Sequence, residues 1–428
     1  MKNIAAWKEQ FLNGEQDVTL TEALSVAAEN VPAQRERYAD ALTAFAAKYG
    51  DGDITVYSVG GRSEISGNHT DHNYGRVIAA SVNLDILAIV KATDNGVIRI
   101  QSEGFPEDVV EPAAIDAPDE AKFFTSAAII AGMEKAFLNA GYKVGGFDAY
   151  TTSNVLKGSG ISSSAAFEVM VGNILNHLYN DGKVSNVEIA KMAQFAENKY
   201  FGKPCGLMDQ TACAVGGFIT IDFADPANPV IEKMDFDLGK AGYALCIVNT
   251  GGNHADLNED YASVPAEMKA VAAVLGVPVL RKTDEEALLA NIAKVRETCG
   301  DRALMRAMHF FAENRRVAAQ VDALRAGDME GFKAGVLASG KSSFQYLQNV
   351  YTTKNVAEQG LSLALCLTEN FLTGTGAAWR VHGGGFAGTI QAFVPLDKVA
   401  DYAAFMNSVF GDHACHVLSV RRDGAMKF

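Results

Sequence analysis

The stretch Lys157-Gly158-Ser159-Gly160-Ile161-Ser162-Ser163-Ser164-Ala165-Ala166-Phe167-Glu168 decides the fold. Glycines and three consecutive serines are followed by good helix formers, a pattern that predicts a tight loop opening into a helix over 164–180. Glycine permits positive φ, and the first turn of a helix leaves N–H donors unpaired at the positive end of the dipole. The loop therefore favours binding of a phosphate group.

Two other phosphate-binding patterns do not match this loop. A P-loop carries a Lys-Ser or Lys-Thr pair after its second glycine, and no such pair follows Gly160. The dinucleotide-binding pattern needs a third glycine, which is missing. An ordinary helix capped by serine after a glycine turn would also have this sequence. The loop alone indicates phosphate binding without establishing it.

Length and composition indicate a globular protein of two domains. The chain has 428 residues, more than one compact core usually holds. Hydrophobic residues make up 48% and charged residues 21%, which is ordinary for a soluble globular protein. The net charge of −14, with no run of lysine and arginine, argues against a nucleic acid partner.

The cysteines and the N-terminus favour a cytoplasmic protein. The six cysteines are scattered without a C-x-x-C pair, which argues against a disulfide framework or a metal cluster. Charged residues interrupt the N-terminus before the apolar segment of a signal peptide could form. No run of about 18 apolar residues is present to span a membrane. We expect a cytoplasmic location and no membrane partner.

The periodicity of the chain predicts mixed helices and strands. We expect helices at the end of residues 1–50 and over 119–140, 164–180, 185–201, 260–275, 284–297, 301–326 and 354–373. We expect strands over 53–59, 77–91, 96–103, 217–223, 243–249 and 389–394. The turn at 225–229 is the predicted place of a domain boundary.

Three further segments are rich in functional residue types. The polar stretch 61–75 contains one Arg, two His, one Asp and two Asn, which suits hydrogen bonding to a polyol, although solvated loops often have this composition. Residues 196–210 contain Asp209 in an apolar setting. This carboxylate could be a general base whose pKa is set by burial and a nearby arginine, or only a helix cap. The third segment is the glycine-rich turn at 383–388.

Taken in order, these segments resemble the galactokinase family of the GHMP small-molecule kinases. The family signature G-R-x-N-x-I-G-E-H-T-D-Y-N is similar to G-R-S-E-I-S-G-N-H-T-D-H-N at 61–73. The family's phosphate loop P-x-G-x-G-L-S-S-S-A resembles 156–165, and its block A-E-H…P-C-G-I-M-D-Q resembles 196–210. Its turn G-G-G-F-G-G resembles 383–388. The resemblance covers the chain from about residue 35 to the end.

The resemblance implies a fold and an activity. The fold is two-domain α+β, with a ribosomal-S5-domain-2-like N-terminal domain, a ferredoxin-like C-terminal domain and the active site in the cleft between them. It places the domains at 35–228 and 229–428, after an N-terminal extension over 1–34 that we expect to be helical. The implied activity is ATP-dependent phosphorylation of the anomeric hydroxyl of galactose with Mg²⁺. We expect a monomer or a weak homo-oligomer.

The resemblance also assigns roles by position. Asp209 matches the carboxylate that accepts the proton of the anomeric hydroxyl, and Arg62 matches the partner that keeps it ionised and stabilises the transferring phosphoryl group. The positions matching nucleotide contacts are Gly158, Ser159, Gly160, Ile161, Ser162, Ser163 and Ser164. Those matching Mg²⁺ ligands are Ser164 and Glu197. Those matching sugar contacts are Asn68, His69, Asp71, His72, Gly206 and Tyr261.

The chain departs from the family in the first signature. The family's glutamate is Asn68, its tyrosine is His72 and its asparagine is Glu64. In galactokinases that glutamate lies near C6 of the sugar, so an amide there removes a charged acceptor and also repulsion toward an anionic substrate. Plant galacturonate kinases also lack this glutamate and have A-H-I-D-H at the same place. Galacturonate or another C6- or N-modified galactose is therefore the alternative substrate.

Two other classes of protein resemble this chain less well. A non-catalytic sensor of sugar and ATP would have a shortened serine loop, whereas residues 162–166 are full length and Arg62, Glu197 and Asp209 are present. A superfamily kinase acting on mevalonate or homoserine is disfavoured by the H-T-D and M-D-Q segments.

Overall fold

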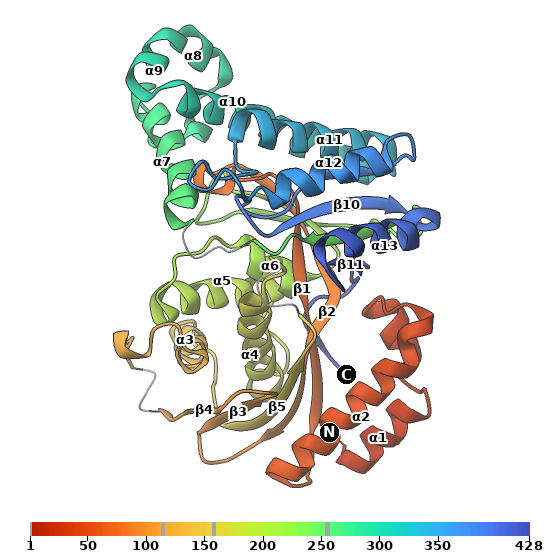
Figure 1. Ribbon diagram of the computed structural model, residues 1–428. Coiled ribbons are helices and arrows are strands. Elements are labelled where there is room, and N and C mark those ends of the chain that lie inside the picture. The colour runs from red at the N-terminus through yellow and green to blue at the C-terminus, as the bar shows by residue number, and fades with distance from the viewer. Residues whose placement is uncertain (1, 113–115, 156–159, 253–256) are drawn as a thin grey trace.

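Two β-sheets organise the protein, whose computed structural model describes residues 2–112, 116–155, 160–252 and 257–428 (Figure 1). The larger sheet has the strand order β12-β1-β2-β5-β3-β4, with β6 paired to β2 and β7 to β6. Its strands are β1 (Thr55–Ser66), β2 (Arg76–Ala92), β3 (Ile98–Ser102), β4 (Glu107–Val110), β5 (Phe147–Ser153), β6 (Phe218–Asp222), β7 (Val230–Met234) and β12 (Met426–Lys427). All pairs are antiparallel except β3 with β5.

The smaller sheet is antiparallel and has the order β11-β8-β10-β9. Its strands are β8 (Tyr243–Asn249), β9 (Ala378–Val381), β10 (Thr389–Pro395) and β11 (Cys415–Leu418). Leu245, Ile247 and Phe393 of this sheet belong to the same buried core as the larger sheet. The two sheets therefore share a hydrophobic core and hold each other in place.

Helices cover both faces of the larger sheet (Figure 1). On one face, α1 (Ile4–Leu12) and α2 (Val31–Tyr49) pack with Val56, Leu87 and Ile89 into a separate cluster. On the other lie α3 (Ser126–Asn139), α4 (Ser163–Tyr179), α5 (Asn186–Ala196) and α6 (Met208–Val215). The N-terminal region thus contributes a core of its own against the sheet.

The remaining helices belong to the C-terminal half of the chain. They are α7 (Asn258–Val274), α8 (Glu285–Ala290), α9 (Ile292–Cys299), α10 (Asp301–Ala326), α11 (Met329–Ser342), α12 (Gly360–Leu372) and α13 (Val399–Phe410).

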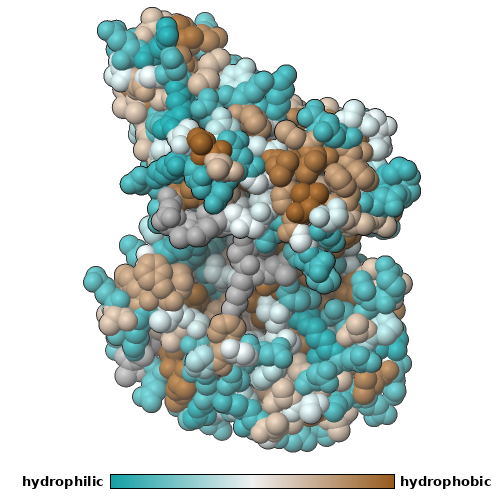
Figure 2. Space-filling model, in the orientation of Figure 1, coloured by the Kyte–Doolittle hydropathy of each residue, from teal (hydrophilic) through white to brown (hydrophobic). Residues whose placement is uncertain are grey.

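The face drawn in Figure 2 is mostly hydrophilic, with hydrophobic residues gathered over α12, where Leu363 is 50% exposed. Among the described residues, no helix combines the length and the hydrophobicity that crossing a membrane requires.

Several predicted elements were wrong in their limits. The strand predicted over 53–59 continues to Ser66, so the glycine pair and the first polar residues of 61–75 are strand and not loop. The helix predicted over 119–140 begins only at Ser126, where Thr125 caps it. The predicted helix 284–297 is two helices divided at Asn291, and the one predicted over 354–373 begins at Gly360. The cap at Thr125 accounts for the start of α3, and residue periodicity alone does not fix the other limits.

The domain limits drawn from the sequence stay a prediction. The helix α2 crosses the predicted limit after residue 34, since it spans Val31–Tyr49. At the other end of the chain, β12 pairs with β1 through Ser58 and Met426, so the last residues return to the larger sheet.

Candidate active site

The Arg62 and Asp209 side chains form a bidentate ion pair. Arg62 lies on β1 and Asp209 in the first turn of α6. Nε and Nη2 of Arg62 donate to the two carboxylate oxygens at 2.7 and 2.5 Å, and the Ser162 hydroxyl donates to the same carboxylate. Burial acts to raise the pKa of Asp209, but the Arg62 guanidinium and the hydrogen bonds outweigh it and lower that pKa below its usual value. Asp209 is therefore a carboxylate at neutral pH.

The described part of the serine loop lies directly against this pair. The backbone N–H of Arg62 donates to the Ile161 carbonyl at 3.0 Å, and its guanidinium donates to the Gly160 carbonyl. A Cβ on Gly61 would lie 2.8 Å from the Ile161 carbonyl, so the glycine permits this close approach. Sequence segments 61–62 and 160–162 thus meet as predicted for one site, while Gly158 and Ser159 lie outside the described residues.

A cavity of about 640 Å³ opens beside the start of α4. Ser163 and Ser164 line it, together with the aromatic rings of Phe105, Phe167 and Phe201. Hydroxyl groups at a helix N-terminus next to apolar rings suit a ligand with a phosphate chain and a flat ring system. Ser162, whose hydroxyl donates to Asp209, directly precedes these two serines, and their nucleotide contacts stay a prediction.

The two predicted Mg²⁺ ligands, Ser164 and Glu197, are not joined by a hydrogen bond in the described structure. Glu197 is nearly buried, with Oε1 3.1 Å from the Lys203 ammonium and Oε2 accepting from the Gln210 amide at 2.7 Å. Near it, Oε1 of the buried Glu168 has no hydrogen-bond partner. Burial and the charge of Glu197 raise the pKa of Glu168 well above its usual value.

Three of the predicted sugar-binding side chains are held by the glycine-rich turn. Their hydrogen bonds go from Asn68 to the carbonyl of Gly383, from His69 to that of Gly384 and from Tyr261 to that of Gly385, at 2.7, 2.8 and 2.8 Å. Two of the first signature's residues and one from α7 therefore meet at a turn of the smaller sheet. Burial lowers the pKa of His69 to about 4, so its ring is neutral at pH 7.

The other predicted sugar-binding residues form a second group. The Asp71 carboxylate lies 3.1 Å from where a Cβ on Gly206 would be, so the loop that leads into α6 lies against it. The His72 ring is 3.7 Å from Asp71, and its side chain is 46% exposed. The structure thus brings Asp71, His72 and Gly206 together beside the M-D-Q block.

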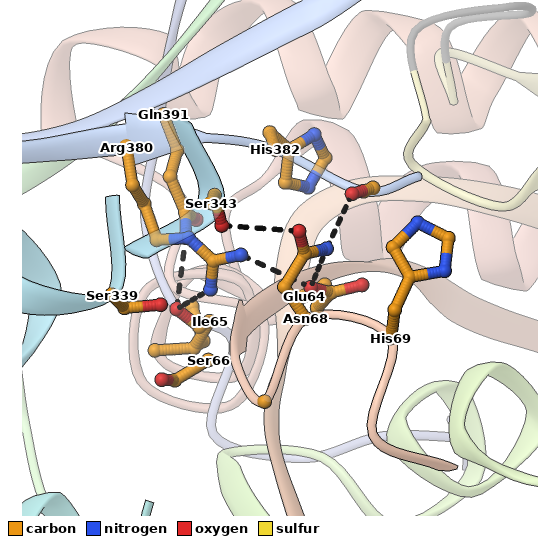
Figure 3. A network of polar contacts seen from close by, with 12 residues as sticks. Glu64, Ile65, Ser66, Asn68, His69, Ser339, Ser343, Arg380, His382 and Gln391 are labelled. Atoms are coloured by element: carbon orange, nitrogen blue, oxygen red, sulfur yellow. Dashed lines mark hydrogen bonds and ion pairs between the residues drawn. The ribbon is translucent and has the colours of Figure 1, made fainter. Parts of the chain in front are cut away.

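Asn68 is the centre of a buried network (Figure 3). Its side chain donates to Glu64 and to the Gly383 carbonyl and accepts from Ser343 and Asn349. Glu64 in turn pairs with Arg380 of β9 at 3.4 Å. The sequence analysis did not single out Ser343, Asn349 or Arg380, and only the nearby glycines pointed to this part of the chain.

Another buried residue that the sequence did not point to is His382, which directly precedes the glycine turn. Its Nε2 lies 3.1 Å from the Ser63 hydroxyl, and its Nδ1 lies 2.8 Å from the Thr389 hydroxyl. Burial, aided by the charges of Arg62 and Arg380, lowers the pKa of His382 to about 3. His382 therefore joins β1 and the smaller sheet as a neutral ring.

Comparison with known proteins agrees with this geometry. The model of the galactokinase galactose-binding signature matches residues 43–92, and that of the GHMP kinases N terminal domain matches residues 126–217. A galactokinase from Streptomyces coelicolor is 33% identical over 350 residues, which cover 81% of this chain and 86% of the relative. The chain belongs to the galactokinase family. It is therefore a phosphotransferase of the sugar-kinase type, as the four sequence segments predicted.

Solved structures agree on the fold. The galactokinase from Lactococcus lactis, complexed with galactose, superposes with a TM-score of 0.75 at 23% identity, covering 90% of this chain and 98% of that one. A mevalonate kinase superposes with a TM-score of 0.61 at 15% identity, covering 86% and 99%. The predicted two-domain α+β fold of the GHMP kinases is confirmed.

Proposed function

We propose that this family member is an ATP-dependent kinase that phosphorylates the anomeric hydroxyl of galactose. The bidentate pair of Arg62 and Asp209 supports the proposal most directly, because both of its side chains contact the serine loop, at Gly160 and Ser162. A non-catalytic sensor does not need a carboxylate held ionised at this place. We take galactose as the substrate because a relative in the same family is a galactokinase.

In this reaction, Asp209 accepts the proton of the anomeric hydroxyl as its oxygen attacks the γ-phosphorus of ATP. The bond from the γ-phosphorus to the bridging oxygen breaks, and ADP leaves. Arg62 lies beside Asp209 and keeps the carboxylate ionised while adding positive charge next to the transferring group. Since the pKa of Asp209 is lowered, it acts mainly by orienting the hydroxyl and accepting the proton late in the transfer.

Oxygen donors for a nucleotide with Mg²⁺ come from Ser164, which lines the cavity, and from Glu168 and Glu197, which both accept from the Gln210 amide. The orphaned oxygen of Glu168 and the carboxylate of Glu197 are hard donors of the kind that Mg²⁺ takes. Within the described ranges, however, no cluster of three or more His, Cys, Asp or Glu side chains is arranged to hold a metal. We infer that Ser164 and Glu197 would hold the ion beside the nucleotide phosphates, where it would neutralise part of their charge. A cytoplasmic location and a monomeric or weakly oligomeric state also stay predictions.

An assay of ADP release with Mg²⁺-ATP over a panel of sugars tests the proposal. The panel contains galactose, galacturonate, N-acetylgalactosamine, glucose and arabinose, and Asp209→Asn is the inactive control. We expect turnover of galactose that the variant lacks. Binding of galactose and ATP without turnover of any sugar would show that the protein is a sensor and not an enzyme.

A further inference from the structure

Two residues of the first signature have exchanged places in this chain. The signature has asparagine at the position of Glu64 and glutamate at the position of Asn68. In the structure the two side chains touch, because the Asn68 amide donates to Oε1 of Glu64 at 2.9 Å. The pair therefore still consists of one carboxylate and one amide, in reversed order.

The Asn68 side chain has no capacity left for a ligand. Its two N–H donors go to Glu64 and the Gly383 carbonyl, and its oxygen accepts from Ser343 and Asn349. It is fully buried. Since an amide has two donors and two acceptor sites, a substrate hydroxyl could bind Asn68 only by displacing one of these partners.

The Glu64 side chain, in contrast, has one oxygen without a partner. Oε1 accepts from Asn68 and lies 3.4 Å from Arg380. No hydrogen-bond donor of the described chain contacts Oε2, which Figure 3 shows turned toward the side of His69. The side chain is 10% exposed. A nearly buried carboxylate oxygen without a donor is costly, and a ligand hydroxyl would satisfy it.

Glu64 lies on the same strand as Arg62 of the catalytic pair. It follows Arg62 by two residues on β1, so both side chains are on one face of the strand. Burial raises the pKa of Glu64. The charges of Arg380 and Arg62 and the hydrogen bond from Asn68 oppose this rise, whereas the Asp71 carboxylate adds to it. The carboxyl of Glu64 is thus close enough to both Arg62 and Asp71 for their charges to act on it.

The cations around Glu64 are already paired. Arg62 makes a bidentate contact with Asp209, and the fully buried Arg380 donates to the Ile65 carbonyl and to Glu64. A sugar carboxylate at this place would meet the carboxylates of Glu64 and Asp71. Nε of Arg380 has no hydrogen-bond partner, but that side chain is fully buried, and Nε and Nη2 of Arg62 are taken by Asp209. Like charges at short range disfavour such a ligand.

We propose that Glu64 has taken over the sugar contact of the missing glutamate, and that it makes the site select a neutral hexose and reject a uronate. The inference rests on the proposed function, since it names the substrate class of the same site. It reverses the expectation from Asn68 alone, because the carboxylate lost at position 68 is regained four residues earlier.

Glu64→Gln tests the proposal, with kinetics measured for galactose and galacturonate. A neutral amide is a weaker acceptor than a carboxylate, so we expect KM for galactose to rise about tenfold with kcat changed less. The ratio of galacturonate to galactose turnover should rise. Glu134→Gln is the matched control, because Glu134 is also a buried carboxylate with an unpartnered oxygen, on α3. It should leave the ratio unchanged.

Glu64→Asp is a second variant that tests the proposal if Glu64→Gln misfolds. It keeps the negative charge and should keep the preference for galactose. An unchanged ratio in a folded Glu64→Gln, or a wild-type preference for galacturonate, would overturn the proposal. Calorimetric measurement of galactose binding distinguishes failure of the kinase function from failure of the role proposed for Glu64. If the wild type binds galactose without turnover and Glu64→Gln weakens binding, the kinase function fails and the role of Glu64 holds. If the wild type binds neither sugar, both fail.

Discussion

The ion pair of Arg62 with Asp209 and the network around Asn68 are both buried, but they are built from different groups. The pair joins two opposite charges in a fixed, planar geometry. The network surrounds one neutral amide with partners from several segments of the chain. The pair keeps the residues of the family signature, whereas the network has exchanged two of them. Chemistry fixes both residue types and their positions in the pair, while the carboxylate and the amide of the network can exchange positions and still bond each other.

The largest effect should come from Asp209→Asn. Losing the proton acceptor should lower kcat about 10³-fold in the ADP-release assay. The thermal midpoint should change much less, because the amide can still accept a hydrogen bond from Arg62. If the variant keeps a tenth or more of the activity, Asp209 is not the proton acceptor. The functional difference between the ion pair and the Asn68 network would then not hold.

Asn68→Ala should act on stability more than on chemistry. It removes a fully buried group that has four side-chain hydrogen bonds, so the free energy of unfolding should fall by about 3 kcal/mol. Urea unfolding measures this, and kcat should stay within a few-fold at temperatures where the variant is folded. A loss of kcat as large as that of Asp209→Asn, with stability unchanged, would contradict a structural role for the network.

Gly385→Ala tests how tightly the glycine turn holds the network. A Cβ there would lie 2.0 Å from the Asn349 carbonyl oxygen, at φ +81°. Gly374 is a matched control, because it has the same φ and nothing within 4 Å of the added atom. We expect Gly385→Ala to be about 2 kcal/mol less stable than Gly374→Ala and to raise KM for the sugar. Equal unfolding midpoints for the two variants would show that the turn adapts freely.

The smallest effect is a pH dependence of stability from the buried histidines. The pKa of His69 falls from 6.5 to about 4 on folding, chiefly through burial, and that of His382 to about 3. The unfolded chain therefore binds more protons in this range, so stability is full above pH 6.5 and declines as the pH falls toward 4. His69→Gln should flatten the decline in urea unfolding. A steeper decline in His69→Gln would show the sign to be wrong.

The family and the main elements could be predicted from the sequence because they depend on local patterns. The serine loop, the helix after it and the M-D-Q block are contiguous motifs, and the structure places Arg62 beside Asp209. Which side chains surround Asn68 could not be predicted. Its partners Ser343, Asn349 and Gly383 lie about three hundred residues away. Only the packing of the smaller sheet against β1, where Arg380 and Gln391 donate to the Ile65 carbonyl, brings them close. The role of Glu64 therefore required the three-dimensional contacts.

The most direct test of the central claim is the position of the phosphate on the product. Galactose labelled with carbon-13 at C1 is incubated with the protein and Mg²⁺-ATP, and the product is examined by carbon and phosphorus NMR. The account predicts that the C1 resonance is split by coupling to phosphorus. A phosphate on another carbon, or unchanged galactose beside a folded protein, would contradict it.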